Sequence, residues 1–423
     1  MKKGDATPFR AGDNAEKGLR SLFSRRAAAA VVLATVLIDV MGLGIILPVT
    51  PELIRELTGE SLSEAARDGG WLWFSYALMQ FFCAPILGGL SDRFGRRPVL
   101  LGSLLAFGVD YLVMGFAPTL AWLFAGRVMA GAAGSAYTTG YAYMADVSPP
   151  EQRAQNFGLI GAAFGVGFIV GPAVGGLLGE LGPRAPFFVA GGLALANFAF
   201  GYFMLRESLP PERRRGFEAR RANPLGTLVQ LRRYPAVLGL AAATFCWQLG
   251  HQALPATWSF YTMYKFGWSE AAVGASLAFV GILMATSQAG LTRVLIPRIG
   301  ERTTAAIALT CATLAFAGYA FASSTAAMYG FMLLWLLAAM GYPSLNALMS
   351  QRVPVDAQGE LQGGVASLFG LAAIVGPPLM AQLFGAFAQG VGGVVFPGAA
   401  FLCASLLTAA SLGLLLRAVP ADP

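Results

Sequence analysis

The chain has 423 residues, of which 56% are hydrophobic and only 12% are charged, and its mean hydropathy is +0.62. Soluble globular proteins carry about 25% charged residues, so the composition excludes that class and indicates an integral membrane protein. The formal net charge of +7 is then a topology signal at the membrane surface and no indication of nucleic-acid binding.

Apolar residues fall into successive blocks of about 20 residues, the length a helix needs to cross a hydrocarbon core of roughly 30 Å. Strands are disfavoured because the runs are rich in Gly and Ala and lack two-residue alternation. We therefore predict an all-α membrane protein with helices near residues 27–49, 70–90, 99–117, 120–145, 156–179, 185–205, 236–262, 270–293, 303–322, 325–349, 361–388 and 396–417.

One long polar stretch, residues 206–235, divides the twelve blocks six and six. The predicted organisation is a cytoplasmic tail, a six-helix bundle, a cytoplasmic central loop, a second six-helix bundle and a short tail, at residues 1–26, 27–205, 206–235, 236–417 and 418–423. Most of the 29 Lys and Arg residues fall on the side of the tail and the central loop. The positive-inside rule then places both termini in the cytoplasm.

The two halves contain similar short sequences at a nearly constant offset. IVGPAVGGLLG, which starts at Ile169, recurs as IVGPPLMAQLFG from Ile374, so that the Gly-Pro pairs lie 205 residues apart. ILPVTP from Ile46 is echoed by ALPATW from Ala253 at an offset of 207. These echoes predict two six-helix bundles related by an axis along the membrane normal, an architecture in which transporters bind substrate between the halves.

The loop GGLSDRFGRRPVLL, residues 88–101, predicts a gating element. Its Gly residues permit close helix approach and a tight turn, and Asp92 can accept from a helix N-terminus or pair with Arg96. The alternative is a solvated positive-inside loop. A second latch is expected between Asp146 and Arg153, so that the gating set is Gly88, Asp92, Gly95, Arg96, Arg97, Asp146 and Arg153.

Few ionisable side chains lie inside the apolar blocks: Asp39, Asp110, Arg127 and His251. Such groups must face a cavity or pair with one another. Two acids and one base leave a net negative site when all are ionised, which suits a proton carrier or a cation. We expect Asp39 and Asp110 to carry protons and Arg127 to tune them, so that proton binding is coupled to motion. The alternative is a purely structural ion triad.

Candidate substrate contacts are polar side chains within the apolar blocks. The stretch QLGHQ offers a polar wall, although a hydrogen-bonded packing role for its His is an equal alternative. The full candidate set is Gln80, Gln248, His251, Gln252 and Asn346. The predicted fifth helix carries small residues that permit a tight crossing, and a Pro that favours a bend: Gly167, Gly171, Pro172, Gly175 and Gly176.

The four Cys residues are isolated within apolar blocks, only one His is present, and no GxxxxGK[ST] loop occurs. The sequence therefore predicts no metal site, no cofactor, no disulfide framework and no ATPase.

The spacing GxxxDRxGRR resembles the signature of the major facilitator superfamily, and GRVMAGAAG and GFIVGPAVGG resemble its motifs in the fourth and fifth helices. More closely, ALMQFFCAPILGGLSDRFGRRPVLL, FGVDYLVM, WQLGHQALPATW and QGELQGGVASL are similar to tetracycline/proton antiporters of the twelve-helix type. In that family, residues matching Asp39, Asp110 and Arg127 are associated with transport. The chain departs from it at Met284 and Ala312, where a His and an Asp are common.

The resulting expectation is a proton-coupled secondary transporter, not an enzyme, in a bacterial inner membrane. It would export an amphipathic small molecule of the tetracycline type, alone or as a divalent-metal chelate, and function as a monomer in contact with anionic lipid. One alternative is export of a different drug or metabolite by the same scaffold. A more distant alternative is a membrane enzyme or receptor, which would need a nucleophile cluster or a soluble module that the sequence lacks.

Overall fold

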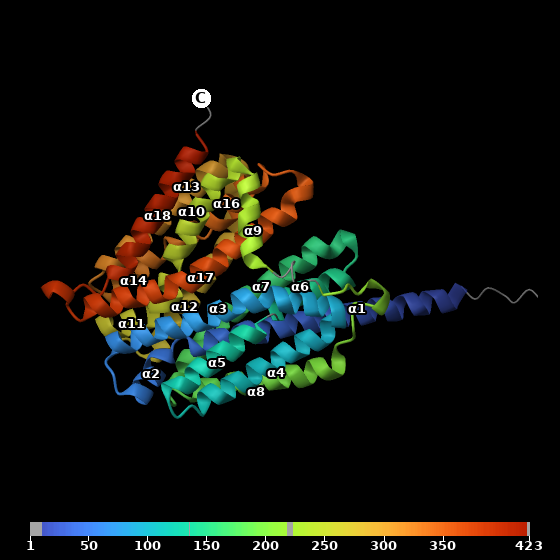
Figure 1. Ribbon diagram of the computed structural model, residues 1–423, viewed down its shortest axis with the longest axis horizontal. Helices are drawn as coiled ribbons and strands as arrows, with labels where there is room; N and C mark the ends of the chain where they lie inside the picture. The colour runs from blue at the N-terminus through green and yellow to red at the C-terminus, as the bar shows by residue number, and fades with distance from the viewer. Residues whose placement is uncertain (1–10, 135, 218–222, 421–423) are drawn as a thin grey trace, which may run out of the picture.

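The computed structural model describes residues 11–134, 136–217 and 223–420, and the described chain is helical without strands (Figure 1). The first half contains α1 (Ala11–Ile46), α2 (Thr50–Thr58), α3 (Leu62–Phe94), α4 (Arg96–Gly115), α5 (Leu120–Ala133), α6 (Ala136–Val147), α7 (Arg153–Gly179) and α8 (Ala185–Met204). The linker contains α9 (Pro224–Gln230). The second half contains α10 (Pro235–His251), α11 (Ala253–Phe266), α12 (Glu270–Thr286), α13 (Thr292–Phe321), α14 (Thr325–Met332), α15 (Trp335–Ala338), α16 (Gly341–Ser350), α17 (Gln358–Ala388) and α18 (Ala399–Ala418).

The predicted twelve membrane-crossing segments are recovered. Nine stretches of the described chain are long and apolar enough to cross a membrane as they stand. One of them, Glu270–Phe321, bends at Gly300, where φ is 76°, and so contains two crossings. Two more crossings are each built from a pair of shorter helices, α5 with α6 and α10 with α11.

Helical structure extends into segments expected to lie outside the membrane crossings. The short helix α2 follows the first crossing, and α3 begins at Leu62 rather than near residue 70. Helix α1 begins at Ala11, inside the segment expected to be a tail. The linker is also partly helical: Asn223 caps α9 by accepting from the backbone N–H groups of Leu225 and Gly226. Thr227 of α9 lies 2.6 Å from the Ser367 hydroxyl of α17, which attaches this part of the linker to the second half.

The two halves form a V in Figure 1, with its apex where α2, α11 and the starts of α3 and α12 gather. We call this the far end, and we call the opposite end, which carries the turns at Gly95 and Gly300, the motif end. Arg67 donates to Gln389 across the halves at 3.0 Å near the apex, and Ser259 donates to the Leu47 carbonyl at 3.0 Å. The arms of the V diverge toward the motif end.

The repeated Gly-Pro pairs lie where helices of the two halves pack closely at the far end. A Cβ on Gly274 of α12 would collide with the Pro172 carbonyl of α7. In the other half of the interface, a Cβ on Gly70 of α3 would lie 3.0 Å from the Pro377 carbonyl of α17. The absence of a side chain thus lets two pairs of helices from opposite halves touch backbone to backbone, in related positions.

The turns at the motif end repeat as well. Gly95 and Gly300 lie 205 residues apart, the offset of the Gly-Pro pairs, and adopt φ/ψ of 106°/160° and 76°/161°. Such a backbone conformation is strained for any residue with a Cβ, so the duplication seen in sequence extends to the geometry of the chain.

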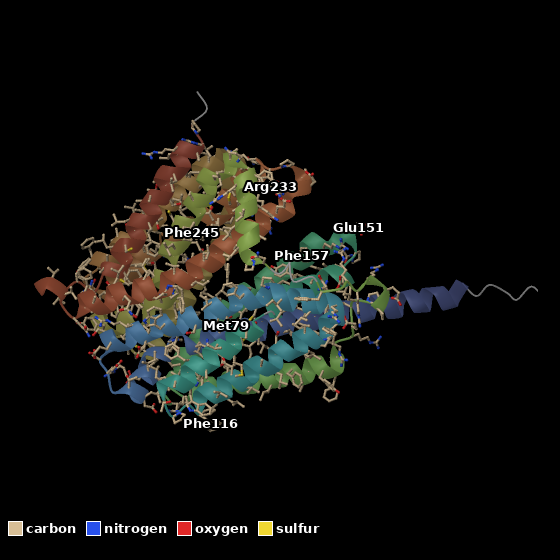
Figure 2. The ribbon with its side chains drawn as sticks, viewed as in Figure 1. Met79, Phe116, Glu151, Phe157, Arg233 and Phe245 are labelled. Atoms are coloured by element: carbon tan, nitrogen blue, oxygen red, sulfur yellow. The ribbon has the colours of Figure 1, made fainter. Side chains whose placement is uncertain are left out.

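The side-chain distribution agrees with a bilayer around the bundle. Large apolar side chains protrude from the helix flanks, as Leu406 of α18 does at 65% exposure and Leu314 of α13 at 53%. Glu151 and Arg233 mark the motif ends of the two arms in Figure 2, where charged residues gather. This pattern, apolar flanks and charged ends, is that of a multi-pass membrane protein.

Replacing Gly176 by Ala should loosen the far end, because a Cβ there would lie 2.5 Å from the Glu270 carbonyl of α12. We expect the variant to lose about 1–3 kcal/mol of stability through overpacking. The measurement is the temperature at which purified protein in detergent loses its monodisperse peak. Gly161→Ala in the same helix is the matched control, because its Cβ would meet nothing within 4 Å. An equal shift for both variants would contradict this packing account.

Candidate transport site and gate

A cavity of about 250 Å³ opens beside Asp39 within the first half. Its walls come from α1, α3, α4, α5 and α7, at Asp39, Val40, Leu43, Tyr76, Gln80, Phe107, Tyr111, Arg127, Phe164 and Gly134, the residue after α5. Asp39 is half-buried and makes no hydrogen bond or ion pair with any residue that the structure describes. A carboxylate at the depth of a membrane helix is thus directed into an internal space, as the cost of lipid exposure requires.

Asp110 and Arg127 form an ion pair at one side of this cavity. The Arg127 Nη2 donates to Asp110 Oδ2 at 2.9 Å, and the two residues are 5% and 0% exposed. Arg127 also lies 2.9 Å from the Met114 sulfur and 5.7 Å from the centre of the Tyr76 ring. A Cβ on Gly126 would lie 2.5 Å from the Asp110 carboxylate, so this Gly makes room for the pair.

The pair is incompletely satisfied. Asp110 Oδ1 and Arg127 Nε are buried without a hydrogen-bond partner among the described residues. Removing one member would leave the other as an uncompensated buried charge, which is far more costly than the pair itself. Because the pair is neutral as a unit, the one unbalanced charge in the cavity wall is that of Asp39 when it is ionised.

Glycines of α7 fix the helix that carries Asp39. Cβ atoms on Gly167, Gly171 and Gly175 would lie within 3.0 Å of the carbonyls of Leu37, Met41 and Ile45, at successive turns of α1. The motif predicted to permit a tight crossing therefore packs against the Asp39 helix itself. Pro172 and Gly176, on the adjoining face of α7, meet α12 of the other half.

The predicted substrate residues divide between the halves. Gln80 lines the cavity and donates to the Tyr76 hydroxyl at 3.1 Å. The four predicted residues of the second half are not among those that line it. His251 packs between Trp247 and Trp335, with ring centroids 5.3 and 5.4 Å away.

The other three residues of the second half have local explanations. Gln252 is 8% exposed and packs on Gly376, where a Cβ would lie 2.5 Å from the Gln252 Cβ. Asn346 accepts from Gln362 at 3.1 Å, and Gln248 is half-buried on α10. Sequence reasoning missed the aromatic wall of Tyr76, Phe107, Tyr111 and Phe164. The spacing of Phe107 and Tyr111 could have indicated part of this wall, because residues four apart share a helix face.

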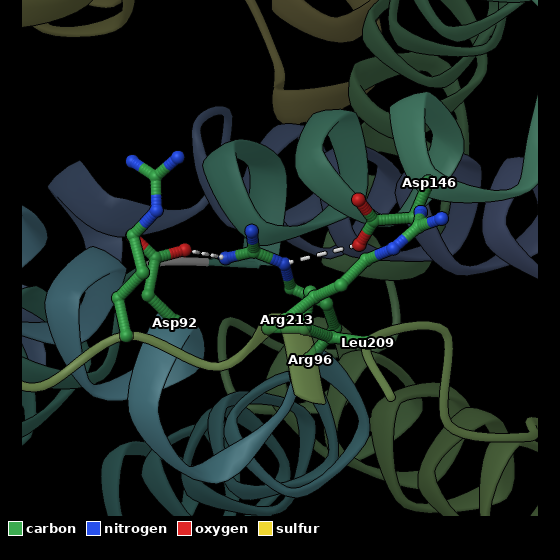
Figure 3. Close-up of a pocket in the computed structure, with 6 residues that line it drawn as sticks. Asp92, Arg96, Asp146, Leu209 and Arg213 are labelled. Atoms are coloured by element: carbon green, nitrogen blue, oxygen red, sulfur yellow. Dashed lines mark hydrogen bonds and ion pairs between the residues drawn. The ribbon is translucent and has the colours of Figure 1, made fainter. Parts of the chain in front are cut away.

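At the motif end, Arg96 joins two acids from different helices (Figure 3). Its Nη1 lies 2.5 Å from Asp92 in α3, and its Nε lies 3.3 Å from Asp146 in α6. Asp92 therefore pairs with Arg96, one of the two roles expected for it. Asp146 also accepts from Ser208 at 3.1 Å, whereas no ion pair joins it to Arg153 among the described residues. The partner of Asp146 is thus Arg96, and the ion pair expected between Asp146 and Arg153 is not formed among the described residues.

Glu207 is a residue of the motif end that sequence reasoning missed. Its two carboxylate oxygens accept from the backbone N–H groups of Arg96 and Arg97 at 2.8 and 3.2 Å, and so cap the start of α4. The absent side chain of Gly95 leaves the space that the carboxylate fills. Arg97 donates to the Tyr202 carbonyl at the end of α8 at 2.7 Å. The first part of the linker is therefore fastened to the motif end of the first half.

The second half carries a related contact at the corresponding positions. At an offset of 205 residues, Glu301 and Gln351 stand where Arg96 and Asp146 stand, and Gln351 donates to Glu301 at 3.1 Å. Pro297 takes the place of Asp92. At these positions the second half has a hydrogen bond between neutral and charged partners where the first half has the Arg96–Asp146 ion pair.

The described residues hold no group of three or more His, Cys, Asp or Glu side chains that could bind a metal ion. They also hold no disulfide, since Cys83, Cys246, Cys311 and Cys403 are free. What the site offers is one unpaired carboxylate, one neutral ion pair and an aromatic wall in a cavity between membrane helices.

Comparisons with known proteins agree with this architecture. The family model described as Major Facilitator Superfamily matches residues 32–377. The chain is 40% identical over 362 residues to the class C tetracycline resistance protein of Escherichia coli, covering 86% of this chain and 91% of that protein. It is 38% identical over 374 residues to the class G protein of Vibrio anguillarum, covering 88% and 94%.

Among solved structures, the human organic anion transporter MFSD10 superposes with a TM-score of 0.70 at 26% identity, covering 92% of this chain and 99% of that one. The matches extend over both bundles and point to transport rather than to an enzyme. The chain belongs to the Major Facilitator Superfamily.

Proposed function

We propose that this protein exports a tetracycline-type drug across a bacterial inner membrane in exchange for protons, acting as a monomer with both termini in the cytoplasm. The observation that carries the proposal is Asp39, an unpaired carboxylate in an internal cavity beside a neutral ion pair. The identity of 34–40% to tetracycline resistance proteins over most of the chain supports the class of substrate. The placement of Lys and Arg supports the orientation, and basic linker residues are available to anionic lipid.

In this mechanism Asp39 alternates between a proton and the substrate. Asp110 and Arg127 hold each other neutral, and their unused polar atoms are available to a rearranged state. Gln80 contacts substrate from the first half, and Gln248, His251, Gln252 and Asn346 do so from the second half when the arms move together. Proton transport is coupled to substrate transport because an ionised Asp39 without a bound partner is costly at this depth. The protein therefore changes conformation only when Asp39 holds either a proton or the substrate.

The gate works at the motif end, where the arms diverge. Gly88, Asp92, Gly95, Arg96, Arg97, Asp146 and Arg153 belong to the loops that would meet the second half on closure. The ion pairs around Arg96 and the cap by Glu207 hold these loops in one shape, so that rocking moves each bundle as a rigid body.

A second candidate is export of a different drug or metabolite by the same machinery. It is favoured by Met284 and Ala312, which stand where tetracycline antiporters commonly carry a His and an Asp. Expression in a susceptible host should raise resistance to tetracycline more than to other drugs of a panel, measured as growth-inhibiting concentrations. Unchanged tetracycline sensitivity at good expression would favour the second candidate.

Asp39→Asn should abolish proton-driven uptake of tetracycline into inverted membrane vesicles, because the amide cannot exchange a proton. Glu180→Gln removes one exposed carboxylate at the end of α7 and should leave uptake unchanged. Uptake with and without Mg²⁺ chelators shows whether the drug travels alone or as a metal chelate. Coupled uptake in the Asp39→Asn vesicles would remove this residue from the proton path.

Glu207→Ala should slow transport about three- to tenfold, because two hydrogen bonds to a charged acceptor at the α4 N-terminus disappear. Substrate affinity should be retained, since Glu207 lies outside the cavity. The measurement is the initial uptake rate as a function of drug concentration. Glu212→Ala, an exposed residue of the same linker, is the control, and equal rates for the two variants would contradict a role for the cap.

A further inference from the structure

An apolar groove of about 430 Å³ runs along the outer flank of the first half. It is lined by Val109, Leu112, Val113 and Phe116, together with Pro118 and Trp122. The first three lie in α4, Phe116 directly follows that helix, and the spacing i, i+3, i+4, i+7 places all four in one stripe about 10 Å long. Figure 2 labels Phe116 at the edge of the first half that lies away from the second half, so the groove faces the bilayer.

The groove has the direction and position of a phospholipid acyl chain. Membrane helices stand roughly along the bilayer normal, so a stripe parallel to α4 runs in that direction too. It ends at the far end, because Gly115 is the last residue of α4 and the turn at Gly95 precedes its first. Trp122 of α5 is exposed beside it, as is common for aromatic residues at a membrane interface.

An ion pair stands at this end of the groove. Arg184 Nη1 donates to the carbonyls of Gly115 and Ala117, both at 2.9 Å, on either side of Phe116. Its Nε donates to Glu56 Oε1 of α2 at 2.9 Å. The first two contacts satisfy carbonyls at the end of α4, and together the three fix the pair beside the groove wall.

Each member of the pair keeps hydrogen-bonding capacity that the described residues do not use. A guanidinium has five N–H donors, and the contacts of Arg184 involve Nη1 and Nε, which leaves both N–H groups of Nη2. Glu56 accepts through Oε1, which leaves Oε2. Both side chains are partly exposed. The rim of the groove therefore offers donors for an anion beside an acceptor for a cation, with no net charge.

This combination selects among phospholipid headgroups. A phosphate accepts well from guanidinium N–H groups, and a primary ammonium two carbons away from it can donate to a carboxylate. A headgroup with a quaternary ammonium has no N–H to donate to Glu56. An anionic headgroup without an ammonium would place its phosphate beside the Glu56 carboxylate with nothing to balance the repulsion.

We propose that this groove and the Arg184–Glu56 pair bind one phospholipid with a primary-ammonium headgroup, phosphatidylethanolamine, from the leaflet at the far end. One acyl chain lies along the α4 stripe, the phosphate accepts from Arg184 Nη2, and the ammonium donates to Glu56 Oε2. Because Glu56 belongs to α2 and Arg184 directly precedes α8, the bound headgroup joins α2, α4 and α8. The inference uses the outer flank alone and does not depend on the proposed transport function.

The test titrates the purified full-length protein in detergent with phosphatidylethanolamine, phosphatidylcholine or phosphatidylglycerol of identical acyl chains, and native mass spectrometry counts the bound lipids. The wild type should bind its first phosphatidylethanolamine about tenfold more tightly than either other lipid, because only this headgroup engages both charged side chains. Glu56→Gln should remove the preference. Glu52→Gln is the matched control and should keep it, because Glu52 forms the same kind of pair on α2, with Arg55 at 2.9 Å.

The groove is tested separately by Val113→Trp, whose larger side chain fills space beside the stripe without touching the ion pair. It should weaken binding of the first phosphatidylethanolamine severalfold, whereas Leu406→Trp on the exposed flank of α18 should leave it unchanged. Equal binding of phosphatidylethanolamine and phosphatidylcholine by the wild type, or tighter binding of phosphatidylglycerol, would overturn the proposal. Equal effects of Glu56→Gln and Glu52→Gln, or of the two Trp variants, would overturn it as well.

Discussion

The buried ion pair between Asp110 and Arg127 is the constraint on which the site depends. In a membrane interior each of these charges alone would be prohibitively costly, and together they are neutral within one hydrogen bond of 2.9 Å. Their mutual neutralisation is what leaves Asp39 as the single unbalanced group of the cavity. The space for the pair comes from Gly126, and the position of the Asp39 helix comes from the Gly167, Gly171 and Gly175 stripe.

The duplicated architecture carries an unequal distribution of charge. At the 205-residue offset, Asp110 and Arg127 correspond to Ala315 and Met332, both fully buried. Asp39 corresponds to Cys246 at the offset of 207. The motif end shows the same bias, with Glu301 and Gln351 in place of the Arg96–Asp146 ion pair. The first half thus holds the intramembrane carboxylates and the Arg96 ion pairs, and at the corresponding positions the second half has Ala, Met and Cys residues and the Glu301–Gln351 hydrogen bond.

Sequence reasoning recovered the features that depend on composition and short-range pattern. The twelve crossings follow from apolar length, and the intramembrane charges follow from their rarity. The Gly-Pro echoes predicted a duplication that the structure shows at Gly70 and Gly274. Glu207 was not predicted as a contact of α4, because nothing in its neighbouring sequence distinguishes one acid in a polar linker rich in Arg. Only the fold shows that it lies at the α4 N-terminus. Likewise, the aromatic wall could not be separated from lipid-facing rings before the helices were placed.

The central claim is that one carboxylate, Asp39, exchanges a proton for the substrate. Adding tetracycline to purified protein in weakly buffered solution, and recording the protons released, tests it most directly. The account predicts release of protons by the wild type and by Glu180→Gln, and none by Asp39→Asn. Equal proton release from Asp39→Asn and wild type would contradict it.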